Sequence, residues 1–316
     1  MNIIESSTIR ASDNADGRDT GGRLKRQRGD LILALLLMVA ASWLPGSAFA
    51  QAVWKVSDGD SYIYLGGTVH LLRPSDFPLP DAYQQAYDDS ERLYLETDLA
   101  AMTDMSVQQR MLRQLTYGDG RTLRSVLDDD VYQELTQYVE SVSGMPMVMM
   151  DSFRPGLLVS TLSVLEFQRM GFTPEGVDAH FYARAMEDGK PVGELETVDE
   201  QFAVLASMGE GYENEFIRYS LQDIDNIGDS IESLVRAWRS GDEQQLEADF
   251  VVPMQEQSQS LYDSLLADRN HAWMTRIEAM FNEPGIDYVL VGAAHMAGED
   301  GLLSLLRERG YQVSRL

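Results

Sequence analysis

The chain has 316 residues, of which 44% are hydrophobic and 24% are charged, a composition typical of a globular protein. Its 51 acidic and 25 basic side chains give a formal net charge of −26. This balance argues against a general nucleic-acid-binding surface and against a basic membrane-surface helix, because both need clustered Lys and Arg. The absence of cysteine excludes disulfides, thiolate metal sites and cysteine nucleophiles.

Residues 1–50 have the pattern of a disordered extension followed by an export signal. Residues 1–22 are polar and show no apolar periodicity, so we expect them to be disordered. The basic stretch Lys25-Arg26-Gln27-Arg28 then precedes an apolar run over residues 31–41, and the segment ends in Ala48-Phe49-Ala50. These are the three parts of a signal peptide, with cleavage expected after Ala50.

The alternative interpretation of this segment is an uncleaved membrane anchor. Pro45-Gly46 end the apolar run, which is shorter than the ~20 residues that a membrane span needs. We therefore expect residues 51–316 to form one exported domain, periplasmic or secreted, with no stable membrane span after cleavage. Residues 1–50 contain five acidic and six basic side chains, so the exported part carries 46 acidic and 19 basic side chains, a formal charge of −27.

The exported part is expected to begin with a β-hairpin, because short apolar runs over residues 53–56 and 62–65 flank the turn sequence Ser57-Asp58-Gly59-Asp60. A helix over residues 80–92 and a strand over residues 93–98 are expected next.

Helical periodicity dominates the middle of the chain, where apolar residues recur at steps of three and four. A short strand over residues 191–196 interrupts it. The expected helices cover residues 107–115, 131–142, 157–170, 176–187, 198–208, 212–222, 227–240, 243–249 and 255–282, the last in one or two pieces.

The chain closes with a strand over residues 288–292, a helix over 301–309 and a strand over 311–315. This order is typical of a right-handed parallel crossover. We predict an α/β fold whose central mixed sheet is formed from the N- and C-terminal strands, with a large helical insert covering it.

Two of the four histidines follow apolar strands with the same spacing, in Gly67-Thr68-Val69-His70 and Gly292-Ala293-Ala294-His295. Ligands of open α/β sheets bind beyond the carboxyl ends of strands, and a neutral imidazole can ligate a metal or accept a proton. The alternative is a pair of surface loop histidines. His180, in an expected helix, and His271 are expected to have structural or surface roles.

Two acidic residues stand out by position. Glu96 lies in the strand expected over residues 93–98, and Glu196 ends the strand over residues 191–196. Burying a carboxylate is costly without a charged partner or a metal. Period-two alternation would place Asp98 on the same face as Glu96. The alternative is that both strands lie at sheet edges with these carboxylates facing outward.

These residues suggest a metal centre. His70, His295 and Glu96, with Glu196 as a further candidate, are suitable ligands for Zn²⁺, Mn²⁺, Co²⁺ or Fe²⁺. Arg269 and Asn270 form a donor pair that would bind a substrate carbonyl or stabilise an oxyanion, the alternative being helix capping and a salt bridge. The chain contains no GxSxG elbow, P-loop or GxGxxG after a strand.

The order of these segments resembles the TraB/GumN family, whose animal relatives include the TIKI proteins, and resembles its bacterial GumN-type branch most. That branch often consists of a signal peptide and this single domain. The resemblance covers about residues 52–316 and includes Gly67-Thr68-Val69-His70 and Leu95-Glu96-Thr97-Asp98. The matching stretches are residues 54–56, 64–72, 95–98, 176–178, 189–197 with 200–201, 265–270, 291–302 and 310–313.

The resemblance implies a fold related to the erythromycin-esterase and ChaN-like group. It also implies a site with His70, His295 and Glu96. Further positions of the family pattern are matched by Glu196, Arg269 and Asn270, and less closely by Asp178. TIKI proteins are described as proteases that depend on a divalent metal, with Mn²⁺ or Co²⁺ supporting activity.

The leading expectation is therefore a metal-dependent hydrolase (Mn, Co or Zn) acting on a peptide or protein substrate. His70, Glu96 and His295 would hold the metal or position water. Glu196 would be a fourth ligand or general base, and Arg269 with Asn270 would orient the substrate. The alternatives are a non-catalytic protein that binds or sequesters peptide signals, and a metal-independent esterase-like hydrolase with His295 as base.

Overall fold

The computed structural model describes residues 51–225 and 227–316. The expected signal peptide over residues 1–50 lies outside this part of the chain. Among the described residues, no helix has both the length and the apolar character that crossing a membrane requires.

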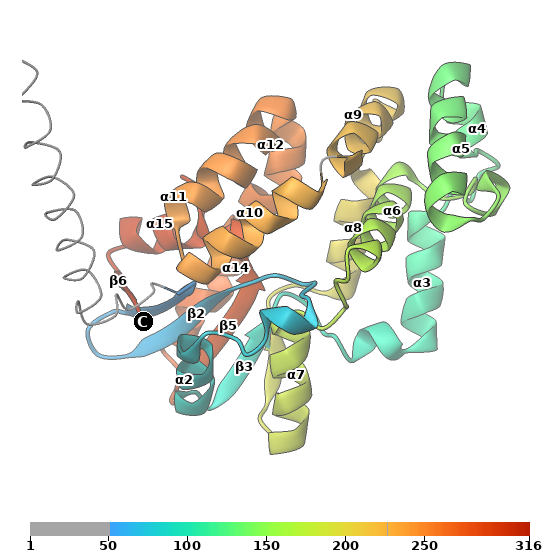
Figure 1. Ribbon diagram of the computed structural model, residues 1–316. Helices are drawn as coiled ribbons and strands as arrows, with labels where there is room; N and C mark the ends of the chain where they lie inside the picture. Colours follow the sequence, from blue (N-terminus) through green and yellow to red (C-terminus); the bar gives the residue numbers. More distant parts are fainter. Residues whose placement is uncertain (1–50, 226) are drawn as a thin grey trace, which may run out of the picture. The chain divides into compact units, whose positions relative to one another are not determined.

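Within the described ranges, six strands form one mixed sheet in the order β4-β3-β5-β2-β1-β6 (Figure 1). The strands β4, β3, β5 and β2 are mutually parallel, whereas β1 is antiparallel to both β2 and β6. The predicted mixed sheet from both ends of the chain is thus confirmed. The bounds are β1 (Val53–Ser57), β2 (Tyr62–Thr68), β3 (Arg92–Leu95), β4 (Val192–Glu194), β5 (Asp287–Gly292) and β6 (Gln312–Arg315).

The central strand β5 is apolar and buried from Tyr288 to Val291, as expected for a parallel strand that is covered on both faces. β5 and β6 run parallel, and β2 and β1 lie between them. Gly66 of β2 is required by close packing, since a Cβ there would lie 2.6 Å from Leu290 Cδ2 and 2.7 Å from the Tyr288 hydroxyl.

Helices cover both faces of the sheet (Figure 1). On one face lie α2 (Asp81–Asp89) and α7 (Val177–Asp188), where the Phe181 ring packs 5.2 Å from Tyr87 and 6.0 Å from Tyr288. The other face carries α14 (Asp268–Met280), whose Arg276 lies 5.4 Å from the ring of Tyr94 in β3.

The helical insert has a second core of its own. It packs Leu135 of α5 (Asp129–Ser143) and Leu158 of α6 (Pro155–Arg169) with Ile217 of α9 (Glu213–Asp225).

The region expected to be one or two helices over residues 255–282 is divided into several pieces. The other α-helical and π-helical segments of the described residues are α3 (Met105–Leu115), α4 (Leu123–Val126), α8 (Val198–Ser207), α10 (Ile227–Ser240), α11 (Glu243–Leu246), the π-helical turn η4 (Glu247–Val251), α12 (Val252–Gln257), α13 (Gln259–Tyr262), the π-helical turn η5 (Asp263–Ala267) and α15 (Leu302–Glu308).

β3 is shorter than the predicted strand over residues 93–98, because it ends at Leu95. Beyond this point the Glu96 carbonyl accepts hydrogen bonds from the backbone N–H groups of Leu195 and Glu196, and the chain leaves the ladder. The predicted alternation therefore does not extend to Asp98, whose carboxylate instead accepts from the backbone N–H of Ala100 at 2.8 Å.

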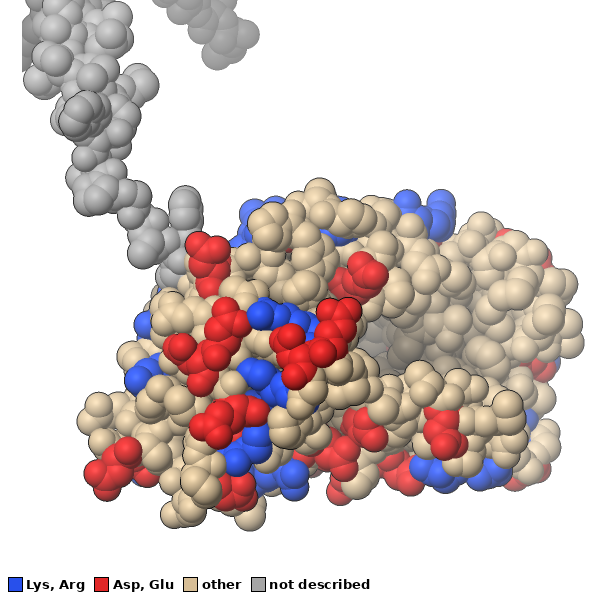
Figure 2. All heavy atoms as spheres, turned by 90° about the horizontal axis from the view of Figure 1, so that it is seen from below, with Lys and Arg blue, Asp and Glu red and all other residues tan. Residues whose placement is uncertain are grey.

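The face of the molecule drawn in Figure 2 carries side chains of both charges. On this face, Lys and Arg side chains are interspersed among Asp and Glu. Exposed ion pairs such as Arg184–Asp88, with an N–O distance of 2.8 Å, are typical of this surface. Each such pair contributes about 1 kcal/mol or less to stability.

Candidate functional site

The four parallel strands each place a polar residue at one edge of the sheet. Because these strands run in the same direction, their carboxyl ends meet there. In the spatial order of the strands, the residues that follow β4, β3, β5 and β2 are Glu196, Glu96, His295 and His70. The backbone N–H of Glu196 donates to the Glu96 carbonyl at 2.9 Å, which holds the two acidic residues in register.

Arg269, in the first turn of α14, joins the two carboxylates. Its Nη2 donates to Glu96 Oε2 at 2.6 Å and to Glu196 Oε1 at 2.7 Å, and its Nε donates to Glu196 Oε2 at 3.0 Å. The three side chains are 14%, 9% and 7% exposed for Arg269, Glu96 and Glu196. One guanidinium therefore compensates two nearly buried carboxylates, which would otherwise be costly to fold together.

The two carboxylates differ in acidity. Burial opposes the ionisation of Glu96, but attraction to His295, Arg269 and His70 outweighs it, and the pKa of Glu96 falls to about 2. Its Oε1 also accepts from the backbone N–H of Gly292 at 2.6 Å. Burial raises the pKa of Glu196 above its ordinary value, although the hydrogen bonds from Arg269 oppose this. Glu96 therefore stays ionised across the physiological range.

Asn270 fixes the orientation of His295. The Asn270 Nδ2 donates to the carbonyls of His295 at 3.3 Å and Asp300 at 2.8 Å, which leaves Oδ1 facing His295 Nδ1 at 2.7 Å. His295 therefore carries its proton on Nδ1, and its Nε2 accepts from Arg269 Nη1 at 3.1 Å. Burial lowers the pKa of His295 to about 3, so the ring is neutral.

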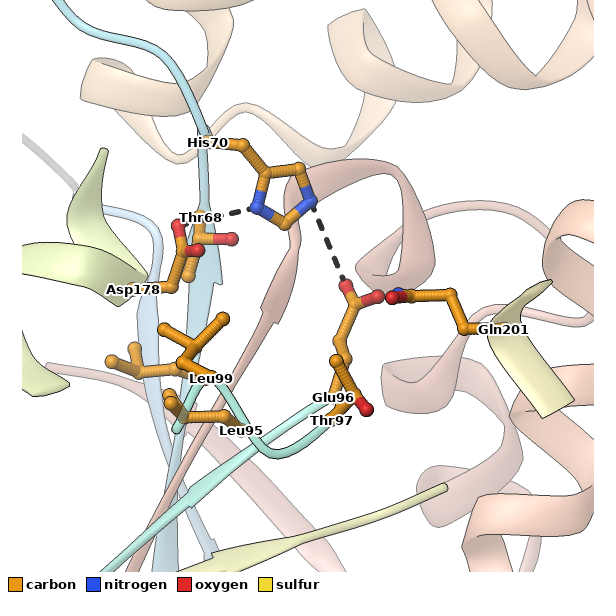
Figure 3. A pocket seen from close by; sticks show the side chains of 9 residues that line it. Thr68, His70, Leu95, Glu96, Thr97, Leu99, Asp178 and Gln201 are labelled. Atoms are coloured by element: carbon orange, nitrogen blue, oxygen red, sulfur yellow. Dashed lines mark ion pairs between the residues drawn. The ribbon is translucent and has the colours of Figure 1, made fainter. Parts of the chain in front are cut away.

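His70, on the other flank of the site, forms an ion pair with Asp178. Its Nδ1 lies 3.2 Å from Asp178 Oδ1 in α7, and its Nε2 points toward Glu96, as Figure 3 shows. The Asp178 carboxylate raises the pKa of His70 to about 9. The His70 ring is 59% exposed, whereas His295 is buried. One accessible and one buried imidazole thus face the same carboxylate.

The Nε2 atoms of His70 and His295 each lie 4.0 Å from the same oxygen, Glu96 Oε1. Among the described residues, no three His, Asp or Glu side chains are placed to hold a metal ion as they stand. Metal–ligand bonds of about 2.0–2.2 Å would draw the two Nε2 atoms and Glu96 Oε1 closer together. Arg269 Nη1, which donates a hydrogen bond to His295 Nε2, would also have to move away. The donors nonetheless fit a divalent metal in chemistry, because each Nδ1 faces an oxygen that orients the ring.

A cavity of about 220 Å³ adjoins His70 and Glu96, and Gln201 of α8 also lines it (Figure 3). Two threonine hydroxyls in its wall are buried. In the part of the chain that the structure describes, Thr68 Oγ1 and Thr97 Oγ1 have no hydrogen-bond partner. Buried hydroxyls in native proteins are normally paired, so these two are suited to binding a polar ligand group or water.

Trp273 belongs to the site but was not predicted from the sequence. Its Nε1 donates to Glu196 Oε2 at 3.1 Å, its ring lies 4.5 Å from the His295 ring, and the Arg269 guanidinium lies 4.7 Å from it. The available signal was its spacing, because residue 273 follows Arg269 by one helical turn on α14 and so shares its face.

The other two histidines lie away from this cluster. His180 packs against Phe77 with ring centroids 5.4 Å apart. His271 is exposed, and its Nε2 lies 3.1 Å from Asp300 Oδ1. Their placement agrees with the structural or surface roles expected from the sequence.

The two site histidines should titrate very differently. The ion pair with Asp178 stabilises the fold below pH 6.5, the ordinary pKa of histidine, and this contribution is lost as the pH rises through about 9. In metal-free protein, NMR titration of the imidazole signals should show His70 titrating near pH 9 and no titration of His295 above pH 5. Asp178→Asn should shift the His70 midpoint down toward 6.5, whereas Asp98→Asn should not. A His70 midpoint unchanged by Asp178→Asn would contradict this assignment.

A sequence profile of the TraB/PrgY/gumN family matches residues 52–315, a range that contains every site residue described above. The chain is 26% identical over 281 residues to the uncharacterized protein YbaP of Escherichia coli, with 86% of this chain and 99% of that protein covered. YbaP of Shigella flexneri matches with the same identity and coverage. No solved structure matches the chain significantly.

Proposed function

The chain belongs to the TraB/PrgY/gumN family, and from this premise we propose that it is an exported metal-dependent hydrolase that cleaves peptide bonds. One observation carries the proposal. Two imidazoles have their Nδ1 atoms held by oxygens of Asp178 and Asn270, while both Nε2 atoms lie 4.0 Å from Glu96 Oε1. This arrangement of ring-orienting partners is typical of metal-binding histidines.

His70, Glu96 and His295 would hold the metal, with Mn²⁺, Co²⁺ and Zn²⁺ as candidates. When bound, such an ion lowers the pKa of a coordinated water toward neutrality and polarises a substrate carbonyl. The low pKa of Glu96 keeps its carboxylate ionised, and neutral His295 has its Nε2 lone pair available once Arg269 releases it. Asp178 would retain a proton on His70 Nδ1 while Nε2 is deprotonated.

Arg269 and Glu196 would act as a unit. Glu196 accepts three hydrogen bonds, two from Arg269 and one from Trp273, which favours a role in holding Arg269 over that of a general base. Arg269, so held, would supply positive charge to a developing oxyanion beside Glu96. The hydroxyls of Thr68 and Thr97 would bind polar groups of the substrate backbone.

The esterase-like alternative, with His295 as base, is less well supported. The Nε2 atom of His295 accepts a hydrogen bond from Arg269. Burial lowers the pKa of His295 to about 3, which makes this ring a weak proton acceptor at neutral pH. A non-catalytic protein that binds peptides would use the same pocket. An assay that measures both peptide binding and cleavage distinguishes this role from hydrolysis.

The test uses metal-depleted protein and a fluorogenic peptide library. Adding Mn²⁺, Co²⁺ or Zn²⁺ should restore cleavage in the wild type but not in His70→Ala or His295→Ala. His271→Ala, a change at an exposed histidine outside the site, should behave as the wild type. Tight peptide binding without cleavage under every metal condition would instead establish the binding role.

Metal affinity should depend on pH in a defined direction. Because the pKa of His70 is raised to about 9, a metal must displace a proton from this ring at lower pH. Titration calorimetry in buffers of different ionisation enthalpy should therefore show affinity rising between pH 6 and pH 9, with close to one proton released per ion at pH 7. In Asp178→Asn the proton release should fall. Affinity that is constant over this range would contradict His70 as a ligand.

A further inference from the structure

A second cavity has a volume of about 420 Å³. It shares Thr68, His70 and Glu96 with the first cavity, which lies beside His70 and Gln201. Its volume lies within the ~300–1,000 Å³ of small-ligand pockets. Most of the rest of its wall is apolar, and its large apolar side chains come from four segments, α10, η4, α12 and η5. The large apolar side chains are Leu234, Phe250, Met254, Leu265 and Leu266.

These side chains are not simply part of the core. Leu234, Phe250, Met254 and Leu265 are half-buried and pack against the main core from one side, while they line the cavity on the other. Large apolar side chains that gather around one hollow beside a polar site are characteristic of a ligand pocket.

The backbone around this cavity is also unusual. Two π-helical turns contribute to its wall, η4 through Phe250 and η5 through Leu265 and Leu266. Single π-helical turns are uncommon and often occur at functional sites, because the wider turn redirects side chains. The turn η5 is tied directly to the polar site, since Arg269 Nη1 donates to the Leu265 carbonyl at 3.0 Å.

The charged groups that line this cavity already have partners. Arg269 is paired with both Glu96 and Glu196. His70 Nδ1 lies 3.2 Å from Asp178 Oδ1, whereas the His295 ring is neutral. A charged ligand side chain would therefore lose its hydration in this cavity without gaining a free partner.

We infer that this cavity receives a bulky aliphatic or aromatic side chain of the peptide substrate, adjacent to the bond that is cleaved. The inference rests on the proposed hydrolase function. Polar groups of the peptide backbone would lie over His70, Glu96 and Thr68, the residues that the two cavities share. Leu234, Phe250 and Met254 would determine the specificity.

The test is a set of peptides that differ only at one residue beside the scissile bond, with Phe, Leu, Ala, Asp or Lys at that position. We expect kcat/KM for Phe and Leu to exceed that for Ala, Asp and Lys by tenfold or more, because one larger apolar group in a matching pocket gives about 10–200-fold discrimination. Phe250→Ala should reduce this preference. The control Phe167→Ala, at a half-buried residue that packs on the same core outside the cavity, should leave it unchanged.

A second variant shows whether misfolding, and not the loss of the pocket, explains a reduced preference in Phe250→Ala. Met254→Asp places a carboxylate in the wall and should raise the relative kcat/KM for the Lys peptide at least tenfold, a gain that damage to the fold does not produce. Identical preferences in the wild type, Phe250→Ala and Met254→Asp would overturn the inference.

Equilibrium binding of the same peptides separates this inference from the proposed function. Binding that favours Phe and Leu, and is weakened by Phe250→Ala, would support the pocket even if no peptide is cleaved, and only the hydrolase proposal would then fail. Cleavage without preference among the five peptides would leave the hydrolase proposal standing and overturn the inference about this pocket.

Discussion

Replacing Arg269 with Met should destabilise the protein by about 3–5 kcal/mol, the usual cost of removing one partner from a buried ion pair. Arg269 is the shared partner of Glu96 and Glu196, and all three side chains are at most 14% exposed. Without the guanidinium, two carboxylates remain close together in a poorly hydrated place. Urea unfolding at pH 7 measures the effect. Arg276→Met, at an exposed position on the same helix, should change the stability by less than about 1 kcal/mol.

The effect of Arg269→Met should also depend on pH. The pKa of Glu96 is about 2 in the folded protein and 4.5 in its ordinary state, so its contribution to stability is present above pH 4.5 and is lost as the pH falls through 2. In the variant, Glu96 loses Arg269, one of the groups that, with His295 and His70, hold its pKa down. The stability difference between wild type and variant should therefore narrow below pH 4.5. A difference that stays constant from pH 7 to pH 3 would show that charge compensation is not its origin.

The second large effect concerns turnover. Glu96→Gln should lower kcat/KM on a cleaved peptide by at least about 100-fold, because changes at groups that only support a metal ligand already cost about 10–100-fold and Glu96 would be a ligand itself. The amide keeps the shape of the side chain and can still accept from the Gly292 N–H, and Arg269 keeps its contacts with Glu196. The fold should therefore survive, which circular dichroism and thermal unfolding would verify.

Glu194→Gln is the matched control for this prediction. Glu194 lies in β4, the strand that precedes Glu196, and is half-buried, but it lines neither cavity beside His70. Its replacement should leave kcat/KM within a factor of two or so, as expected for a change outside the site. Equal turnover by Glu96→Gln and Glu194→Gln would remove Glu96 from the proposed mechanism.

The grouping of the strand-end residues was predictable because it follows from one rule. Parallel strands end at a common edge, so His70, His295, Glu96 and Glu196 were expected to converge once each was placed after a strand. Their relative order was not predictable, because the strand order β4-β3-β5-β2 depends on packing between segments distant in the sequence.

The roles on α14 were only partly accessible from the sequence. Arg269 and Asn270 stood out as adjacent polar donors, but their partners depend on how this helix docks on the sheet. Trp273 resembles an ordinary core residue in an amphipathic helix, and its hydrogen bond to Glu196 depends on the same docking. The early end of β3 depends on the backbone hydrogen bonds that the Glu96 carbonyl accepts, which are equally non-local.

If His70, Glu96 and His295 form a metal centre, the purified protein binds a divalent ion, and its metal content tests this most directly. Elemental analysis after dialysis against a defined mixture of Mn²⁺, Co²⁺ and Zn²⁺ should give close to one divalent ion per chain in the wild type. The double variant His70→Ala/His295→Ala should give close to none, while His180→Ala/His271→Ala should match the wild type. Wild-type protein that retains no metal after this dialysis, or a His70→Ala/His295→Ala variant that retains as much metal as the wild type, would contradict the assignment of this metal centre.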